Sequence, residues 1–271
     1  MPERAGLPFR LQTLNLRSKM FNYGLKLWST NRQYLPEARR LFQKGTYQFL
    51  ELYVVPETAE ALPLWRALKD EGVPVIIHAA HYGHGLNLAV PSAAADNQRL
   101  AGEAFHFADE LGSEIVIFHP GIGGTEAETV RQLKLMGDRR IVIENKPYVT
   151  VDGQKICNGH SPEAIAQIIR ETGAGFCLDI GHAICSANAQ RREPFAYLNE
   201  YLALKPKLFH LTDGDSQSDR DSHRHFGRGD YDLPKLLALI PAESWITVET
   251  VKSDPANLND FVADLEVLKH V

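Results

Sequence analysis

Histidine and acidic side chains recur in this sequence immediately after short apolar runs. Each is of a residue type that binds divalent cations in proteins. A lone histidine in such a place usually makes an ordinary hydrogen bond, but six positions with the same relation to an apolar run favour side chains that converge on one site. The six positions are His78, His119, Glu144, Asp179, His210 and Glu249.

Three further residues extend this set. His182 follows Asp179 by one helical turn, and Asp221-Ser-His223 has a spacing that lets both side chains point to one ion. Four nearby carboxylates would repel one another and raise one another's pKa values unless positive charge compensates them. Multivalent cations are an economical compensation, and mixed imidazole and carboxylate ligands suit zinc, manganese or iron.

The elements that must position these residues alternate along the chain. Short apolar runs are followed by amphipathic stretches, which is typical of parallel strands connected by helices. Apolar residues within 100–111 and within 258–268 recur at helical spacing, and Gly72, Gly112 and Gly173 are expected at helix ends. Strands are predicted at residues 22–27, 48–54, 73–77, 114–118, 140–143, 175–178, 207–209 and 245–248.

Eight strands favour a closed barrel over an open doubly wound sheet. No G-x-G-x-x-G motif follows the first strand, which argues against a dinucleotide-binding domain. We therefore predict an α/β fold, a single (β/α)8 TIM barrel domain over residues 1–271. Active sites of such barrels lie at the carboxyl ends of the strands, where the six positions described above occur.

Composition excludes several classes of protein. A formal charge of −5 gives no general basic surface for nucleic acid. The apolar runs are too short to span a bilayer, and residues 1–17 lack the apolar core of a signal peptide, so we predict a cytoplasmic protein with no membrane partner. Its three cysteines have no C-x-x-C spacing, and reduced thiols are expected.

In combination, the motifs resemble the endonuclease IV and xylose isomerase-like (β/α)8 barrel superfamily, which includes AP endonuclease family 2 and sugar phosphate isomerase/epimerase-like proteins. The resemblance covers nearly the whole chain, in the right order. The motifs are His78-Ala-Ala-His-Tyr, Phe118-His119-Pro-Gly, Ile143-Glu144-Asn, Leu178-Asp179-Ile-Gly-His182-Ala, Phe209-His210-Leu-Thr-Asp, Asp221-Ser-His223 and Val248-Glu249-Thr.

This resemblance implies a xylose isomerase-like barrel with a multinuclear metal site. The corresponding positions of endonuclease IV bind three zinc ions, so we expect two or three divalent ions per chain, zinc first and manganese or iron as alternatives. Glu144 would bridge two of them. The implied ligands are His78, His119, Glu144, Asp179, His182, His210, Asp221, His223 and Glu249.

Two chemistries remain open at this stage, with Glu144, Glu249 and His182 as the expected catalytic residues. The first is metal-dependent hydrolysis of a phosphoester, in which Arg224 and Arg228 are candidates for phosphate contacts. The second is isomerisation or epimerisation of a sugar or polyol with a single metal, in which Glu144 and Glu249 exchange a proton. A non-catalytic metal-binding barrel is a third hypothesis, which no positive feature supports.

The sequence departs from the DNA repair enzymes in its second loop. Those enzymes carry a long polar and aromatic loop there, whereas Tyr53-Val-Val-Pro-Glu-Thr-Ala-Glu passes directly into a predicted helix. We therefore expect a small phosphorylated or polyhydroxylated substrate, enclosed by the loops after the third, fifth and seventh strands. Duplex DNA is expected to be a poor substrate, and the sequence does not indicate an oligomeric state.

Overall fold

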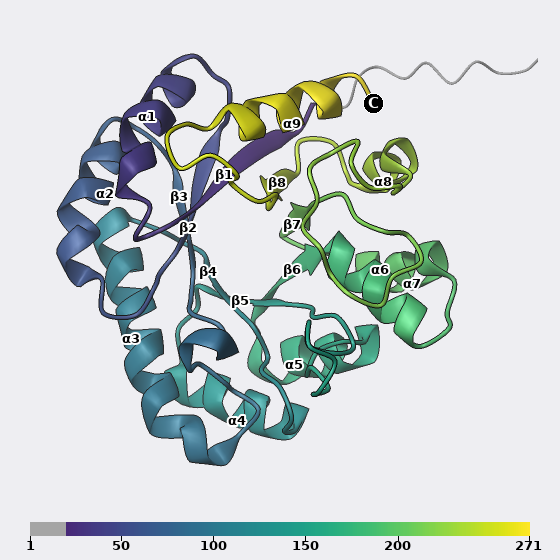
Figure 1. The fold of residues 1–271 in the computed structure, drawn as a ribbon. Coiled ribbons are helices and arrows are strands. Elements are labelled where there is room, and N and C mark those ends of the chain that lie inside the picture. The colour runs from purple at the N-terminus through teal and green to yellow at the C-terminus, as the bar shows by residue number, and fades with distance from the viewer. Residues whose placement is uncertain (1–19) are drawn as a thin grey trace, which may run out of the picture.

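Eight parallel strands form a closed barrel in the computed structural model, which describes residues 20–271 (Figure 1). Each strand pairs with the next along the chain, and β8 pairs with β1 to close the barrel. The predicted (β/α)8 TIM barrel is therefore confirmed. The strands are β1 (Asn22–Trp28), β2 (Phe49–Tyr53), β3 (Val75–His78), β4 (Val116–Phe118), β5 (Ile141–Glu144), β6 (Gly175–Asp179), β7 (Leu208–Leu211) and β8 (Trp245–Val248).

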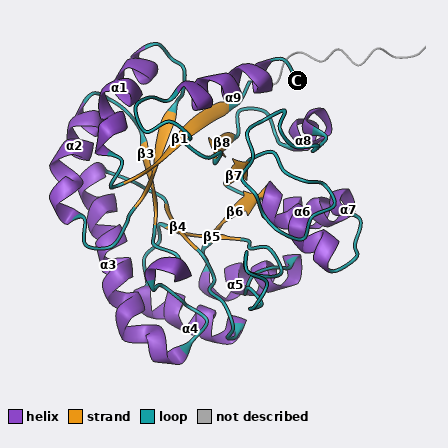
Figure 2. Cartoon of the chain, in the orientation of Figure 1, coloured by secondary structure: helices purple, strands orange, loops and turns teal. Residues whose placement is uncertain are grey.

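Helices surround the strands on the outside of the barrel (Figure 2). The α-helices are α1 (Leu35–Gln43), α2 (Leu62–Asp70), α3 (Ala94–Leu111), α4 (Glu126–Met136), α5 (Pro162–Thr172), α6 (Ile180–Ala189), α7 (Pro194–Leu202), α8 (Leu233–Leu239) and α9 (Asn259–Lys269). Short 3-10 helices are η1 (Arg32–Tyr34), η2 (Ala59–Ala61), η3 (Tyr82–His84) and η4 (Pro91–Ala93). The short connection from β2 to η2 confirms the predicted abbreviated second loop.

Helix boundaries follow the expected local signals. Gly112 and Gly173 end α3 and α5 with φ angles of 66° and 75°, which glycine adopts without steric cost. Ser161 begins α5 by accepting a hydrogen bond from the Ala164 amide at 3.2 Å.

In four strands, a polar residue extends the strand past its predicted end. Hydrogen bonds between strands use the backbone, so a polar side chain does not end the ladder. The clearest case is β7, which we predicted at 207–209 and which continues through His210. His78, Glu144 and Asp179 likewise belong to β3, β5 and β6.

Two apolar layers hold the barrel together. The larger one lies between the strands and the surrounding helices. The smaller one takes one side chain from each of six strands, and side-chain alternation places these residues inside the barrel. We call this inner layer the apolar plug; it consists of Phe49, Ile76, Ile117, Val142, Cys177 and Leu208.

Residues 1–19 lie outside the described part of the chain. The prediction of one domain over residues 1–271 and the interpretation of residues 1–17 therefore stay predictions. Among residues 20–271, no helix is both long and apolar enough to cross a bilayer. The three cysteines are buried and unpaired, as expected.

Candidate metal centre

The candidate site lies one layer above the apolar plug. Side chains two residues apart in a strand point to the same side, so each plug residue is followed by an inward-facing residue closer to the carboxyl end of its strand. In six strands that residue is acidic or a histidine. These residues are Glu51, His78, His119, Glu144, Asp179 and His210.

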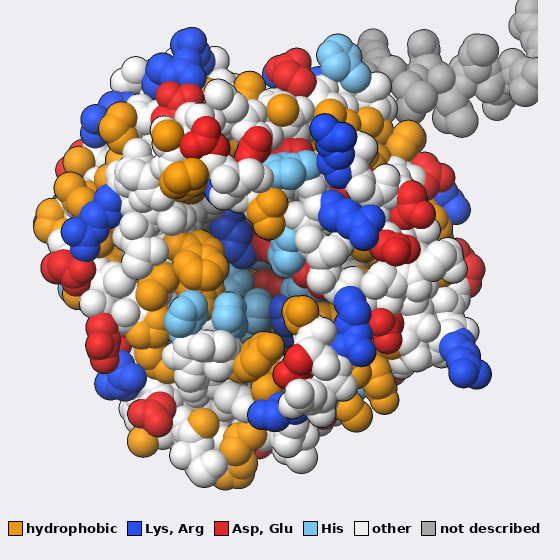
Figure 3. All heavy atoms as spheres, viewed as in Figure 1, with side chains coloured by type: hydrophobic (Ala, Val, Ile, Leu, Met, Phe, Trp, Pro, Cys, Tyr) orange, Lys and Arg blue, Asp and Glu red, His pale blue; other side chains and the backbone are white. Residues whose placement is uncertain are grey.

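A cavity of about 610 Å³ opens above these residues. Figure 3 shows histidine, lysine and acidic side chains gathered in the hollow at the centre of this face. Loops after β3, β5 and β7, which we expect to enclose the substrate, line the cavity, and the loops after β1 and β8 line it as well. The residues that these five loops contribute include Asn31, Tyr82, Pro147, Thr150, Cys157, Asp221, His223 and Lys252.

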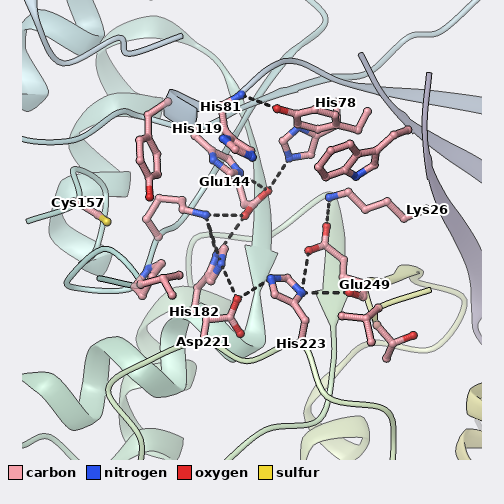
Figure 4. Close-up of a pocket in the computed structure, with 18 of the residues that line it drawn as sticks. Lys26, His78, His81, His119, Glu144, Cys157, His182, Asp221, His223 and Glu249 are labelled. Carbon is pink, nitrogen blue, oxygen red and sulfur yellow. Dashed lines mark hydrogen bonds and ion pairs between the residues drawn. The ribbon is translucent and has the colours of Figure 1, made fainter. Parts of the chain in front are cut away.

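Glu144 lies at the centre of the site and is 1% exposed (Figure 4). Its Oε2 atom is 3.2 Å from Nε2 of both His78 and His119, and 3.3 Å from Nδ1 of His210. Its Oε1 atom is 3.1 Å from Nδ1 of His182. The two oxygens therefore face different groups of donors.

Hydrogen bonds hold the histidine rings in fixed orientations. Nδ1 of His78 donates to the Ala79 carbonyl at 2.7 Å, and Nδ1 of His223 donates to the Glu249 carbonyl at 3.0 Å. Each ring thereby keeps Nε2 for the cavity. Metal-binding histidines typically donate their other ring N–H to a carbonyl or carboxylate in this way.

Glu51 orients His210, and sequence analysis missed it. Its Oε2 atom accepts hydrogen bonds from Nε2 of His210 at 2.9 Å and from Oγ1 of Thr247 at 2.6 Å. Nδ1 of His210 is left 2.8 Å from Oε1 of Glu249. The predicted site residues follow apolar runs, whereas Glu51 lies inside β2. The signal that identifies it is the same two-residue step from the plug, here Phe49-Leu-Glu51.

Lysine side chains supply positive charge that sequence analysis also missed. Lys26 contacts Oε1 of Glu249 and lies 3.1 Å from Oε1 of Glu51. Nζ of Lys146 lies 3.3 Å from Nε2 of His182 and 3.7 Å from Oε1 of Glu144. The carboxylates are therefore partly compensated by the chain itself.

The pKa values follow this charge distribution. Burial raises the pKa of Asp179 to about 6, and the charges of Glu249 and Glu144 act in the same direction. Burial also opposes ionisation of Glu144, but His119, His210 and Lys146 together hold the pKa of that carboxyl well below its usual range. The rise that we expected for uncompensated carboxylates thus occurs only at Asp179 among the four.

Asp221 and His223 come from the loop after β7. Nε2 of His223 lies 2.6 Å from Oδ2 of Asp221, and Nε2 of His182 lies 3.4 Å from the same oxygen. His223 has a φ angle of 44°, which is uncommon for a residue other than glycine. Such backbone strain is found mainly where surrounding contacts fix a functional side chain.

All nine predicted ligands are brought together by the fold. Together with Glu51 and Cys177, they fall into groups whose ligand atoms lie within 4.8 Å of one another: His78, His119 and Glu144; Glu144, Asp179 and His182; His182, Asp221 and His223; Glu51, His210 and Glu249; and Glu144, Cys177 and His210. Nδ1 of His210 and Oε1 of Glu51 form no hydrogen bond, but each faces an opposite charge: the first lies 2.8 Å from Oε1 of Glu249 and the second 3.1 Å from Nζ of Lys26. Imidazole and carboxylate groups gathered this closely fit divalent cations.

The expected arginine contacts are not found. Arg224 and Arg228 are not among the cavity-lining residues of the described chain, since the loop turns them elsewhere. The backbone amide of Arg224 donates to the Asp213 carbonyl, and the Asp213 amide donates to the Arg224 carbonyl, each at 3.0 Å. Lys26, Lys146 and Lys252 are the cations that line the cavity.

Comparison with known proteins gives the family of this chain. Residues 45–271 match the family model described as "Xylose isomerase-like TIM barrel", and the chain belongs to that family. No curated protein matches the chain.

Solved structures show the same fold at low identity. A D-tagatose 3-epimerase-like protein is 20% identical, with a TM-score of 0.71, 92% of this chain covered and 96% of that chain. Endonuclease IV from Thermus thermophilus is 21% identical, with a TM-score of 0.66 and coverage of 92% and 98%. The TTHB071 protein of the same organism, soaked with ZnCl2, is 22% identical, with a TM-score of 0.62 and coverage of 90% and 98%.

Proposed function

We propose that this chain is a divalent-metal-dependent hydrolase that cleaves a phosphoester in a small substrate. The observation that carries the proposal is the position of Glu144 between two groups of donors. His78 and His119 face one of its oxygens, and His182 faces the other. A carboxylate whose two oxygens face different histidines suits a centre with more than one metal ion. Such centres are used in phosphoester cleavage.

The residues that would hold the ions are the nine ligands named above. When bound, divalent ions would polarise a phosphoryl oxygen and bring the pKa of water toward neutrality. The likeness to a structure soaked with ZnCl2 makes zinc the first metal to test, with manganese and iron next.

The chain's own residues recognise the substrate in this proposal. Lys26, Lys146 and Lys252 place positive charge on the cavity wall, which favours an anionic phosphoryl group. The exposed rings of Trp28 and Tyr82 lie among the cavity-lining residues and offer apolar surface to the rest of the molecule. A cavity of about 610 Å³ is in the range typical for small-molecule ligands.

A sugar or polyol epimerase is the second candidate. Nδ1 of His210 lies between Glu249 at 2.8 Å and Glu144 at 3.3 Å, so a single ion there would have a carboxylate on either side. Those two carboxylates would then exchange a proton with carbon atoms beside a carbonyl group. The likeness to an epimerase-like structure also supports this candidate.

The first prediction separates these candidates. Protein loaded with Zn²⁺ or Mn²⁺ is analysed for ions per chain and assayed with bis(p-nitrophenyl) phosphate and p-nitrophenyl phosphate. We expect at least two ions per chain and metal-dependent release of p-nitrophenolate. Glu144→Gln should reduce turnover at least a thousandfold, because it removes the central charge at nearly constant volume.

Exposed Glu266→Gln on α9 is the matched control and should retain full activity. A single ion per chain, no phosphoesterase activity and incorporation of solvent deuterium into a ketose would reject the hydrolase in favour of the epimerase.

A further inference from the structure

Lys26 has an unusual position for a lysine in a candidate metal site. It lies on β1 between Leu25 and Leu27, which belong to the larger apolar layer outside the barrel. Because side chains alternate along a strand, the Lys26 side chain points into the barrel. Its side chain is 14% exposed, and its partners Glu51 and Glu249 are 0% and 5% exposed. Figure 4 shows the ammonium group directed at the Glu249 carboxylate.

The same carboxylates form a candidate metal group with His210. Oε1 of Glu249 faces both Lys26 and Nδ1 of His210, which lies 2.8 Å away. A divalent ion held by this oxygen would lie close to the ammonium group, and like charges at such distances repel strongly where water is excluded. Lys26 and the ion therefore compete for one carboxylate.

The group of His78, His119 and Glu144 differs in this respect. Both histidines face Oε2 of Glu144, at 3.2 Å, whereas Lys146 contacts the other oxygen, Oε1, at 3.7 Å. Among the described lysines, the ion pair recorded with Glu144 is this contact to Oε1, on the side away from the two histidines. An ion can bind at this end without displacing an ammonium group.

We propose that Lys26 is a built-in counter-ion that competes with a divalent cation for Glu249. The ion held by His210 and Glu249 is consequently the most weakly bound of the centre, while the ion at His78, His119 and Glu144 binds first. This inference rests on the proposed metal-dependent function. It adds that one lysine determines the order in which the metal ions bind.

The test compares metal affinity and stability of the chelator-treated protein. Wild type, Lys26→Met, Lys26→Gln and Lys26→Arg are titrated with Zn²⁺ in competition with a chromophoric chelator, and melting temperatures are measured with and without Zn²⁺. Removing the charge should tighten the weakest binding step at least tenfold and leave the tightest step unchanged. The metal-free Met and Gln variants should melt below wild type, and added Zn²⁺ should close that difference.

Two controls define the cause. Lys26→Arg keeps the charge and should bind Zn²⁺ like wild type. Lys252→Met removes a charge from the same cavity, but its ammonium donates to the Thr250 carbonyl rather than to a carboxylate. It should change every binding step by less than threefold.

Other outcomes are equally clear. If Lys26→Met and Lys26→Gln bind Zn²⁺ as wild type does or more weakly, or melt lower by the same amount with and without Zn²⁺, Lys26 is a structural ion pair and the inference is wrong. If no variant, wild type included, binds Zn²⁺ or Mn²⁺, the metal-dependent function itself fails.

Discussion

At the scale of single residues, Glu51 connects the barrel interior to the candidate metal centre. It is fully buried and contacts His210, Thr247 and Lys26, three residues from three different strands. A buried carboxylate is costly unless its hydrogen bonds and charge are satisfied, and these contacts offset much of that cost. Glu51 therefore positions His210 rather than acting on a substrate.

The second prediction concerns the contribution of Glu51 to stability. Burial opposes ionisation of Glu51, but His210 and Lys26 outweigh it and lower its pKa to about 2. Because the folded-state pKa lies below the ordinary value of 4.5, the stabilisation is present above about pH 4.5 and is lost as the pH falls to about 2. The effect is on the order of 3 kcal/mol.

Urea unfolding of metal-free wild type and Glu51→Gln measures this effect. The difference in unfolding free energy should be constant above pH 5 and shrink between pH 4.5 and pH 2. Exposed Glu60→Gln, whose partner is Arg32, is the control and should parallel wild type because solvent screens that pair. A difference that does not change with pH would mean that Glu51 does not depend on its charge.

The third prediction concerns Lys26 and is the increase in Zn²⁺ affinity described above. Lys26 and Glu249 are 223 residues apart in the chain. Only the pairing of β1 with β8, which closes the barrel, brings them together. For this reason no local pattern in the sequence indicates their contact.

At the scale of elements, a hydrogen bond joins the loop after β4, which begins at His119, to the loop after β3. Gly121 has a φ angle of 111°, and a Cβ atom there would lie 2.3 Å from Oδ1 of Asn87 and 2.7 Å from the Ala89 amide nitrogen. Asn87 in turn accepts a hydrogen bond from the Ile122 amide at 2.9 Å. The two loops after β3 and β4 are thereby joined.

The fourth prediction is that Gly121→Ala separates these loops. We expect a loss of stability of roughly 2–4 kcal/mol, from steric conflict added to the cost of positive φ, and weaker Zn²⁺ binding because His119 is displaced. Gly123→Ala is the control: its φ is also positive, at 66°, but no atom lies within 4 Å of the added Cβ. It should cost only about 1 kcal/mol. Equal losses in both variants, measured by urea unfolding, would contradict the proposed loop contact.

The elements were largely predictable, whereas the interior contacts were not. Alternation of apolar runs with amphipathic stretches indicated the barrel, and glycines such as Gly112 and Gly173 marked the helix ends. The candidate ligand positions could also be predicted, because polar residues directly after apolar runs stand out in the sequence. Glu51 and Lys26 lie inside strands, where nothing in the local sequence shows that a single charged residue faces inward. For Glu51, the two-residue step from Phe49 of the apolar plug gives that information.

At the scale of the whole molecule, charge and shape support the proposal of a small substrate. The chain has a net charge of −5, and only residues 54–58 separate β2 from η2. Duplex recognition usually needs basic surface along the phosphate backbone and burial on the order of 1,000 Å² or more. Positive side chains of the cavity lie inside the hollow, which suits a small anion better than a duplex (Figure 3).

The fifth prediction follows from the proposal of a small substrate. Metal-loaded protein at nanomolar concentration and low salt should not incise duplex DNA with a single abasic site above the enzyme-free background. The same preparation is assayed with the small phosphoesters as a positive control. Efficient cleavage that Glu144→Gln abolishes would refute the small-substrate proposal and indicate DNA repair.

The apolar plug affects how ions and a substrate would enter and leave the barrel. Phe49, Ile117 and Val142 fill the barrel interior below the candidate ligands, and the cavity lies above them, lined by the loops after the strands. Ions at the floor and a substrate above them would share the entrance on the side of these loops. Ions at the floor would therefore bind before the substrate and leave after it, because a bound substrate would block their exit.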